Sequence, residues 1–166
     1  MKTLDGLVQY AQQHIGSPYW YGAFGQAATP ELENKLRAEF PNCWNRAGNV
    51  SKDYGSYVYD ASGIIKGYIW TTDNGLTYNQ SQDLNCFGFY LKAQRKGKMN
   101  DAPATFPGTA GTLVYKTCNG KVIGINHIGV YADGYVYEAK PGEGVVKTPF
   151  NANDWSFWSS CVFIDG

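Results

Sequence analysis

Residues 59–70 read YDASGIIKGYIW, and this stretch says more about the fold than any other part of the 166-residue chain. Its apolar side chains recur at the spacing of one helical face, which predicts a helix with one buried side. These positions are Ala61, Ile64, Ile65, Tyr68 and Ile69. Asp60 precedes them and is a residue type that caps helix N-termini. The sequence therefore places Ala61 at the start of a buried helix.

Residues 126–139, NHIGVYADGYVYEA, read as two strands joined by a tight turn. The dipeptide Asp133-Gly134 is a strong signal for a two-residue hairpin. His127 lies on the first strand and Glu138 on the second. A hairpin can bring this imidazole and this carboxylate close together, but their contact depends on a register that the sequence does not fix.

Other elements can be placed outward from these two stretches. Helical periodicity predicts helices at residues 4–15, 31–40 and 80–95. After Pro107 the period changes, and we expect strands at residues 112–116, 122–132, 135–139, 145–148 and 161–164, with a second tight turn at Asn119-Gly120. Helices first and an antiparallel sheet second define an α+β domain. We expect one domain over residues 1–166, with an insertion at about 27–57 that is too rich in aromatic residues to be a linker.

The order of these residues suits one kind of chemistry. A cysteine at a helix N-terminus has its thiolate stabilised by exposed backbone N–H groups, and a histidine on a facing strand can hold its proton. A third polar group on the next strand can then orient the imidazole. His127 and Glu138 supply the last two parts, whereas position 61, where the cysteine would stand, is alanine.

Three motifs in order resemble the NlpC-type family of peptidoglycan hydrolases. They are Tyr-Trp-Tyr-Gly at 19–22, Asp-Ala-Ser-Gly at 60–63 and His-Ile-Gly-Val-Tyr at 127–131. Each alone is a weak signal, but together they span nearly the whole chain. The resemblance implies a papain-like fold with N-terminal helices packed on a C-terminal antiparallel β-sheet. It also implies a cysteine endopeptidase, without a cofactor, that cleaves the peptidoglycan stem peptide after D-glutamate.

The chain departs from the family pattern at two positions. Glu138 stands where many members carry histidine, although carboxylates serve as orienting groups in related families. Ala61 stands at the nucleophile position, and a methyl group cannot attack a carbonyl carbon. We therefore expect this form to be inactive. We favour an engineered replacement of cysteine over a natural loss, because His127, Glu138 and the residues flanking position 61 are retained.

The resemblance also assigns substrate contacts to Tyr19, Asp60 and Ser62, which in similar enzymes hold the amino end of the stem peptide. A carboxylate facing an ammonium group is a sensible clamp for an N-terminal L-alanine. Two of these residues have a structural alternative, since Asp60 can be a plain helix cap and Tyr19 a plain core ring. Both roles can coexist.

The cysteines do not supply the missing nucleophile. They stand at Cys43, Cys86, Cys118 and Cys161. None opens a helix behind a capping aspartate, so we expect free, buried thiols with a structural role. Their wide spacing and the presence of only two histidines also argue against a metal site.

Charge and composition exclude several other functions. Lysine plus arginine equals aspartate plus glutamate, 14 against 14, so no net field attracts nucleic acid or an anionic membrane. The N-terminus lacks the pattern of a signal peptide, and no apolar run approaches the roughly 18 residues of a membrane helix. We expect a monomer that acts on the bacterial cell wall, outside the cell after secretion or lysis. An amidase, a natural wall-binding pseudoenzyme and, less favoured, an acyltransferase are the alternatives.

Overall fold

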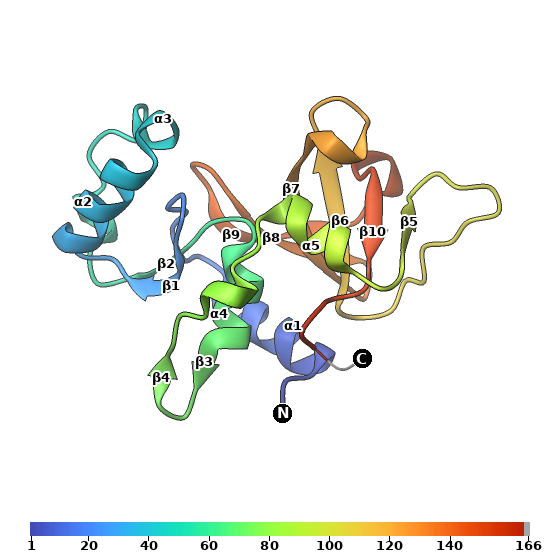
Figure 1. Cartoon of the computed structure of the whole chain (residues 1–166), viewed down its shortest axis with the longest axis horizontal. Coiled ribbons are helices and arrows are strands. Elements are labelled where there is room, and N and C mark those ends of the chain that lie inside the picture. Colours follow the sequence, from blue (N-terminus) through green and yellow to red (C-terminus); the bar gives the residue numbers. More distant parts are fainter. Residues whose placement is uncertain (165–166) are drawn as a thin grey trace.

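The computed structural model describes residues 1–164, in which helices pack beside a six-stranded antiparallel sheet. The helices are α1 (Leu4–Gln13), α2 (Pro30–Glu39), α3 (Pro41–Trp44), α4 (Gly63–Trp70) and α5 (Cys86–Lys92). Two small sheets pair β1 (Phe24–Ala27) with β2 (Tyr57–Tyr59) and β3 (Thr71–Thr72) with β4 (Gly75–Leu76). Figure 1 shows α2 and α3 on one side of the molecule and the large sheet on the other, with α1 and α4 between them.

The large sheet has the strand order β5-β10-β6-β7-β8-β9. Its strands are β5 (Lys96–Lys98), β6 (Thr112–Thr117), β7 (Ile125–Ala132), β8 (Tyr135–Lys140), β9 (Gly144–Pro149) and β10 (Phe157–Ser159). Between β7 and β8, Asp133 and Gly134 both have positive φ, 51° and 85°. This is the geometry that a two-residue hairpin requires, so the predicted turn is confirmed.

Helices α1 and α5 cover one face of the large sheet. Ile128 and Val130 alternate along β7 and join a cluster of buried side chains that also contains Leu7 of α1 and Phe89 of α5. The opposite face carries a smaller cluster around Trp155. An α+β architecture with helices on an antiparallel sheet is therefore confirmed.

The insertion forms a lobe around a small core that it shares with Trp20, Ala23 and Val58. Residues 27–57 contain α2, α3 and the short helix η1 (Ser51–Asp53). Arg37 of α2 ties the lobe together, because its guanidinium group lies 5.0 Å from the ring centroid of Trp44 and donates to Glu33 and to the carbonyl oxygen of Gly48. The lobe is thus a packed unit rather than a loose loop.

Two predicted helices are shorter than expected. The helix after Asp60 begins at Gly63 rather than at Ala61, because residues 57–59 pair with β1 and Asp60 closes a turn. Residues 80–95 split into the short helix η2 (Gln80–Gln82) and α5, and Asn85 caps α5 by accepting a hydrogen bond from a backbone N–H group. Residues 96–98, which follow the predicted helix directly, form β5.

The final predicted strand and the second predicted turn are wrong. Residues 161–164 are not a strand, and the last strand is β10, which lies between β5 and β6. Residues 118–124, which include the short helix η3 (Val122–Gly124), connect β6 to β7. The Asn119 side chain accepts hydrogen bonds from Thr117 and from the N–H of Lys121, and such local bonds compete with a tight hairpin.

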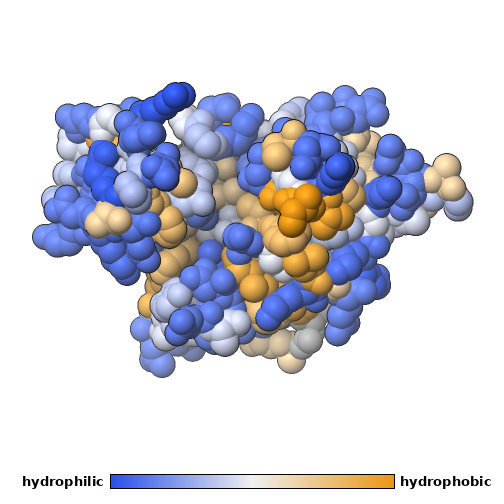
Figure 2. Space-filling view, turned by 45° about the horizontal axis from the view of Figure 1, so that its top comes forward, coloured by the Kyte–Doolittle hydropathy of each residue, from blue (hydrophilic) through white to orange (hydrophobic). Residues whose placement is uncertain are grey.

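The apolar surface is unevenly distributed. Figure 2 shows hydrophobic side chains gathered on one part of the surface, while the opposite end is mostly hydrophilic. The exposed apolar residues include Leu91 on α5 and Ile123 on η3, two elements that lie in contact. Within residues 1–164, no helix is both long and apolar enough to span a bilayer.

Candidate active site

His127 and Glu138 form a hydrogen-bonded pair on neighbouring strands. The imidazole Nε2 lies 2.8 Å from Glu138 Oε1, so the predicted contact between these side chains is present. The pairing of β7 with β6 shifts between His127 and Ile125, which leaves Asn126 as an extra residue in the ladder. Bulges of this kind redirect side chains and are common beside active sites.

The pair lies beneath an aromatic ring, with Glu138 buried and His127 partly exposed. Glu138 is 1 % exposed, and the Trp155 ring stacks on the imidazole with centroids 5.8 Å apart. Burial alone would raise the pKa of Glu138, but the hydrogen bond and charge of His127 outweigh it and hold that pKa below its ordinary value. An ionised carboxylate at Nε2 favours a proton there, which leaves Nδ1 free to accept a proton from a nucleophile.

Asp60 is held in the turn before α4 by two backbone groups. Its carboxylate oxygens accept hydrogen bonds from the N–H groups of Gly63 and Gly22, each at 2.8 Å. The first bond caps the turn that leads into α4, as the structural alternative predicted. The second ties this turn to the motif at 19–22. Burial raises the pKa of Asp60, against the opposing effects of Lys66 and the two N–H groups.

Ala61 and Ser62 follow in the same turn and are 9 % and 4 % exposed. Ala61 belongs to the cluster of buried residues that includes Ile128, on the face of the sheet that the helices cover. His127 precedes Ile128 on the strand and stacks on Trp155, which belongs to the cluster on the opposite face. Since α4 begins at Gly63, position 61 lies in the turn just before the helix, whose first N–H group, that of Gly63, is bonded to Asp60. The expectation that the Ala61 Cβ points at the imidazole stays a prediction.

Two cavities meet at Tyr21. One, of about 650 Å³, is lined by residues that include Asp60 and Ser62. The other, of about 520 Å³, is lined by Tyr19 and by the insertion lobe. Burial and the Asp60 carboxylate raise the pKa of Tyr19. The three predicted substrate contacts thus line two cavities that share Tyr21. His127 lines neither cavity.

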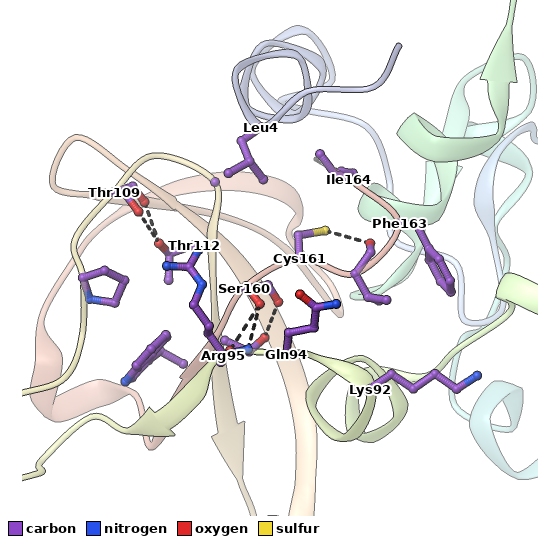
Figure 3. A pocket seen from close by; sticks show the side chains of 15 residues that line it. Leu4, Lys92, Gln94, Arg95, Thr109, Thr112, Ser160, Cys161, Phe163 and Ile164 are labelled. Atoms are coloured by element: carbon purple, nitrogen blue, oxygen red, sulfur yellow. Dashed lines mark hydrogen bonds between the residues drawn. The ribbon is translucent and has the colours of Figure 1, made fainter. Parts of the chain in front are cut away.

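A larger cavity lies away from these residues. It has a volume of about 700 Å³ and is bordered by α1, the end of α5 and the C-terminal segment. Figure 3 shows Leu4, Lys92, Arg95 and Cys161 among the side chains around it. No predicted site residue lines this cavity, so size alone does not locate the candidate site.

Sequence reasoning missed two features beside the site. Lys66 lies one helical turn beyond Ser62, is 8 % exposed and donates a 2.8 Å hydrogen bond to Asp83. Lysine is rarely this buried unless it is paired, so a lone charge inside the apolar stretch 63–70 was an available signal. Trp155, which stacks on His127, lies in no motif and gave no signal.

The four cysteines carry free thiols, but they are not all buried as expected, since Cys43 and Cys118 are exposed. Cys86 opens α5 behind its capping residue Asn85, a position that the sequence reasoning overlooked. Burial and the charge of Asp60 raise the pKa of Cys86 to about 12, so this group is a neutral thiol at neutral pH. In the described residues, no three His, Cys, Asp or Glu side chains are grouped to hold a metal ion.

No family model and no curated protein matches this chain. Solved structures do. RipD from Mycobacterium tuberculosis, described as a non-catalytic NlpC/p60 domain protein adapted to peptidoglycan binding, is similar with a TM-score of 0.54 and 16 % identity, over 96 % of this chain and 97 % of that one. An NlpC/p60 family protein from Bacillus cereus has a TM-score of 0.54 and 13 % identity, over 96 % and 40 %.

A third similar structure is the P60 domain of an antigen from M. avium paratuberculosis, with a TM-score of 0.51 and 13 % identity over 96 % of this chain and 93 % of that one. Identities this low show the fold alone. The chain therefore has an NlpC/p60-type α+β fold, and the architecture expected from the three motifs is confirmed.

Proposed function

We propose that this chain is a bacterial cell-wall domain that binds the stem peptide of peptidoglycan and has the parts of a cysteine endopeptidase except its nucleophile. The observation that carries the proposal is the His127–Glu138 pair, 2.8 Å apart beneath Trp155. A buried carboxylate such as Glu138 is costly unless it is paired. A chemical role explains why such a pair stands here. The domain would act outside the cell, as a monomer.

The proposed chemistry requires a cysteine at position 61 whose thiol comes within reach of His127. His127 Nδ1 would then accept the thiol proton while Glu138 holds Nε2–H, and the sulfur would attack the carbonyl carbon of the stem-peptide amide. The backbone N–H of position 61 would stabilise the oxyanion that forms. The imidazolium then gives its proton to the leaving amine, and water releases the acyl group from sulfur. With Ala61 no bond to the carbonyl carbon can form, so the peptide is bound and not cut.

Binding is assigned to the turn before α4. Asp60 accepts two backbone hydrogen bonds, yet each carboxylate oxygen has a second lone pair that can accept from a primary ammonium group. Ser62 lines the same cavity, and Tyr19 lines the adjoining one. These contacts suit a stem peptide with a free L-alanine amino group. An amidase would instead need room for the glycan at this end.

A natural binding module is the second candidate. Its support is the likeness to RipD, which is described as non-catalytic and adapted to peptidoglycan binding. In that case Ala61 is native and the pair at His127 is a remnant. The two candidates differ in what happens when cysteine is placed at position 61.

The deciding experiment incubates the chain and its Ala61→Cys variant with purified peptidoglycan, followed by mass spectrometry of the released fragments and assay of the bound protein. We expect both proteins to sediment with the wall and only the cysteine variant to release peptides cut after D-glutamate. Ala61→Ser is the matched control, since its hydroxyl is a far weaker nucleophile at this site.

Each other outcome has a meaning. Release of glycan from L-alanine would assign an amidase. Binding by both proteins without release would favour the natural binding module. A chain that neither binds wall material nor gains activity would contradict the proposal.

A further inference from the structure

Lys66 is an unusual charge for its position. It lies in α4, its side chain is among the buried polar groups, and its Nζ donates to Asp83 Oδ1 at 2.8 Å. The other oxygen of Asp83 accepts a hydrogen bond from Tyr78, also at 2.8 Å. Asp83 thus holds the Lys66 ammonium group in place, and Tyr78 holds Asp83 in place.

Lys66 and Asp60 line the same cavity, and Lys66 is the strongest of the influences that oppose the effect of burial on the pKa of Asp60. Other charged or titratable groups face Asp60 from the neighbouring elements. The carboxylate of Asp83, just after η2, raises the pKa of Asp60, whereas Lys66 lowers it. Tyr19, Tyr21 and Cys86 are neutral at physiological pH. Two more charges line this cavity from α2, Lys35 and Glu39, and both are exposed to solvent.

We propose that Lys66 is a positioning residue for ligand binding: its buried ammonium group, fixed by Asp83, keeps the Asp60 carboxyl group ionised so that it can hold a primary amine. This inference rests on the proposed function, in which Asp60 receives the amino end of a peptide. A buried carboxyl group without a nearby cation tends to take up a proton. A neutral Asp60 would lose most of its attraction for an ammonium group.

The pH dependence follows in sign. Burial raises the pKa of Asp60, so acidification protonates this carboxyl group earlier than an exposed aspartate. Removal of the Lys66 charge would raise that pKa further, and amine binding would then be lost at a higher pH. Removal of the Asp83 charge would act in the opposite direction.

The first measurement needs no ligand. The carboxyl carbon of Asp60, assigned with Asp60→Asn, is titrated by ¹³C NMR in the intact chain and its variants. We expect Lys66→Met to raise the pKa of Asp60 by about one unit or more, the usual effect of losing a nearby opposite charge. Lys66→Arg should restore most of the original value. Lys35→Met is the matched control, because it removes an exposed lysine from the same cavity and should move the Asp60 titration little.

Lys66→Met and Lys35→Met giving the same Asp60 titration would overturn the proposal. If Lys66→Met does not fold in a thermal melt, Lys66→Gln decides, since it also removes the charge and the proposal requires it to raise the pKa of Asp60. A fall or no change in that variant counts against the proposal.

The second measurement is calorimetric titration with L-alanyl-D-glutamate peptide and its N-acetylated form across pH. We expect the acid limit of amine-dependent binding to shift upward in Lys66→Met by the amount found by NMR. Equal affinity for both peptides at every pH would contradict the proposed amine site, while the NMR titration would still decide the role of Lys66.

Discussion

The two halves of the candidate site are built differently. The His127–Glu138 half stands on one hairpin, where two adjacent strands and a two-residue turn fix the contact. The Asp60 half is assembled from distant segments, because Asp60 accepts a hydrogen bond from Gly22, and Lys66, in the helix that follows Asp60, is paired with Asp83. Under the proposed function, the hairpin half supplies proton transfer and the Asp60 half supplies ligand binding.

The sharpest way to break this comparison is to remove His127 in the Ala61→Cys background. We expect hydrolysis of muropeptide to fall by on the order of 10⁴-fold or more, as for loss of one member of a catalytic triad. Peptide affinity of the Ala61 form should stay within about twofold when His127→Ala is added, because ground-state contacts come from the other half. Steady-state kinetics and calorimetry measure the two effects. A loss of peptide affinity as large as the loss of hydrolysis would contradict the proposed separation of binding from proton transfer.

Glu138→Ala tests whether the hairpin half is also structural. The change leaves His127 without its buried charged partner, and we expect the free energy of unfolding to fall by about 1.5 to 3 kcal/mol. Denaturant melts measure it. Glu138→Gln keeps an acceptor for Nε2–H and should lose less. Equal losses in the two variants would mean that the hydrogen bond itself contributes little.

Asp60→Asn tests the assembled half. Asparagine has one acceptor oxygen where Asp60 accepts from the N–H groups of Gly22 and Gly63, so one of these bonds is lost together with the charge for the amine. We expect stability to fall by about 1 to 3 kcal/mol, and affinity is therefore compared at matched folded fraction. We expect affinity for a peptide with a free amino group to fall about tenfold or more, equivalent to about 1.5 to 3 kcal/mol. The N-acetylated peptide serves as the control ligand. An unchanged ratio between the two peptides would leave Asp60 as a cap only.

The smallest expected effect is the pH dependence of stability. The folded-state pKa of Glu138 lies below its ordinary value, so its ionised form stabilises the fold above the unfolded-state pKa, and this contribution is lost as pH falls through the folded-state pKa. Thermal melts between neutral and acid pH should therefore converge for the chain and Glu138→Gln at the acid end. Melts that remain parallel down to the lowest pH would show that Glu138 is not stabilised by ionisation.

Local signals were reliable where the backbone itself carries them. The turn at Asp133-Gly134 was predicted because positive φ at both central residues restricts the choice of residue. The register pairs Val130 with Tyr137, so His127 and Glu138 meet as diagonal neighbours on adjacent strands. The similar signal at Asn119-Gly120 misled, because the Asn119 side chain bonds to nearby groups and residues 118–124 take a longer path. Helix boundaries also moved, since pairing of residues 57–59 with β1 delayed α4 until Gly63.

The sequence by itself determined the fold class, the helix after Asp60 and the residues of the hairpin pair, because periodicity and turn chemistry act over a few neighbouring residues. Only the tertiary structure decided that Asp60 bonds to Gly22, that Lys66 is buried against Asp83 and that Trp155 covers His127. Such contacts join residues far apart in the chain. They exist only after packing has fixed the path of every segment between them, and no short pattern records that path.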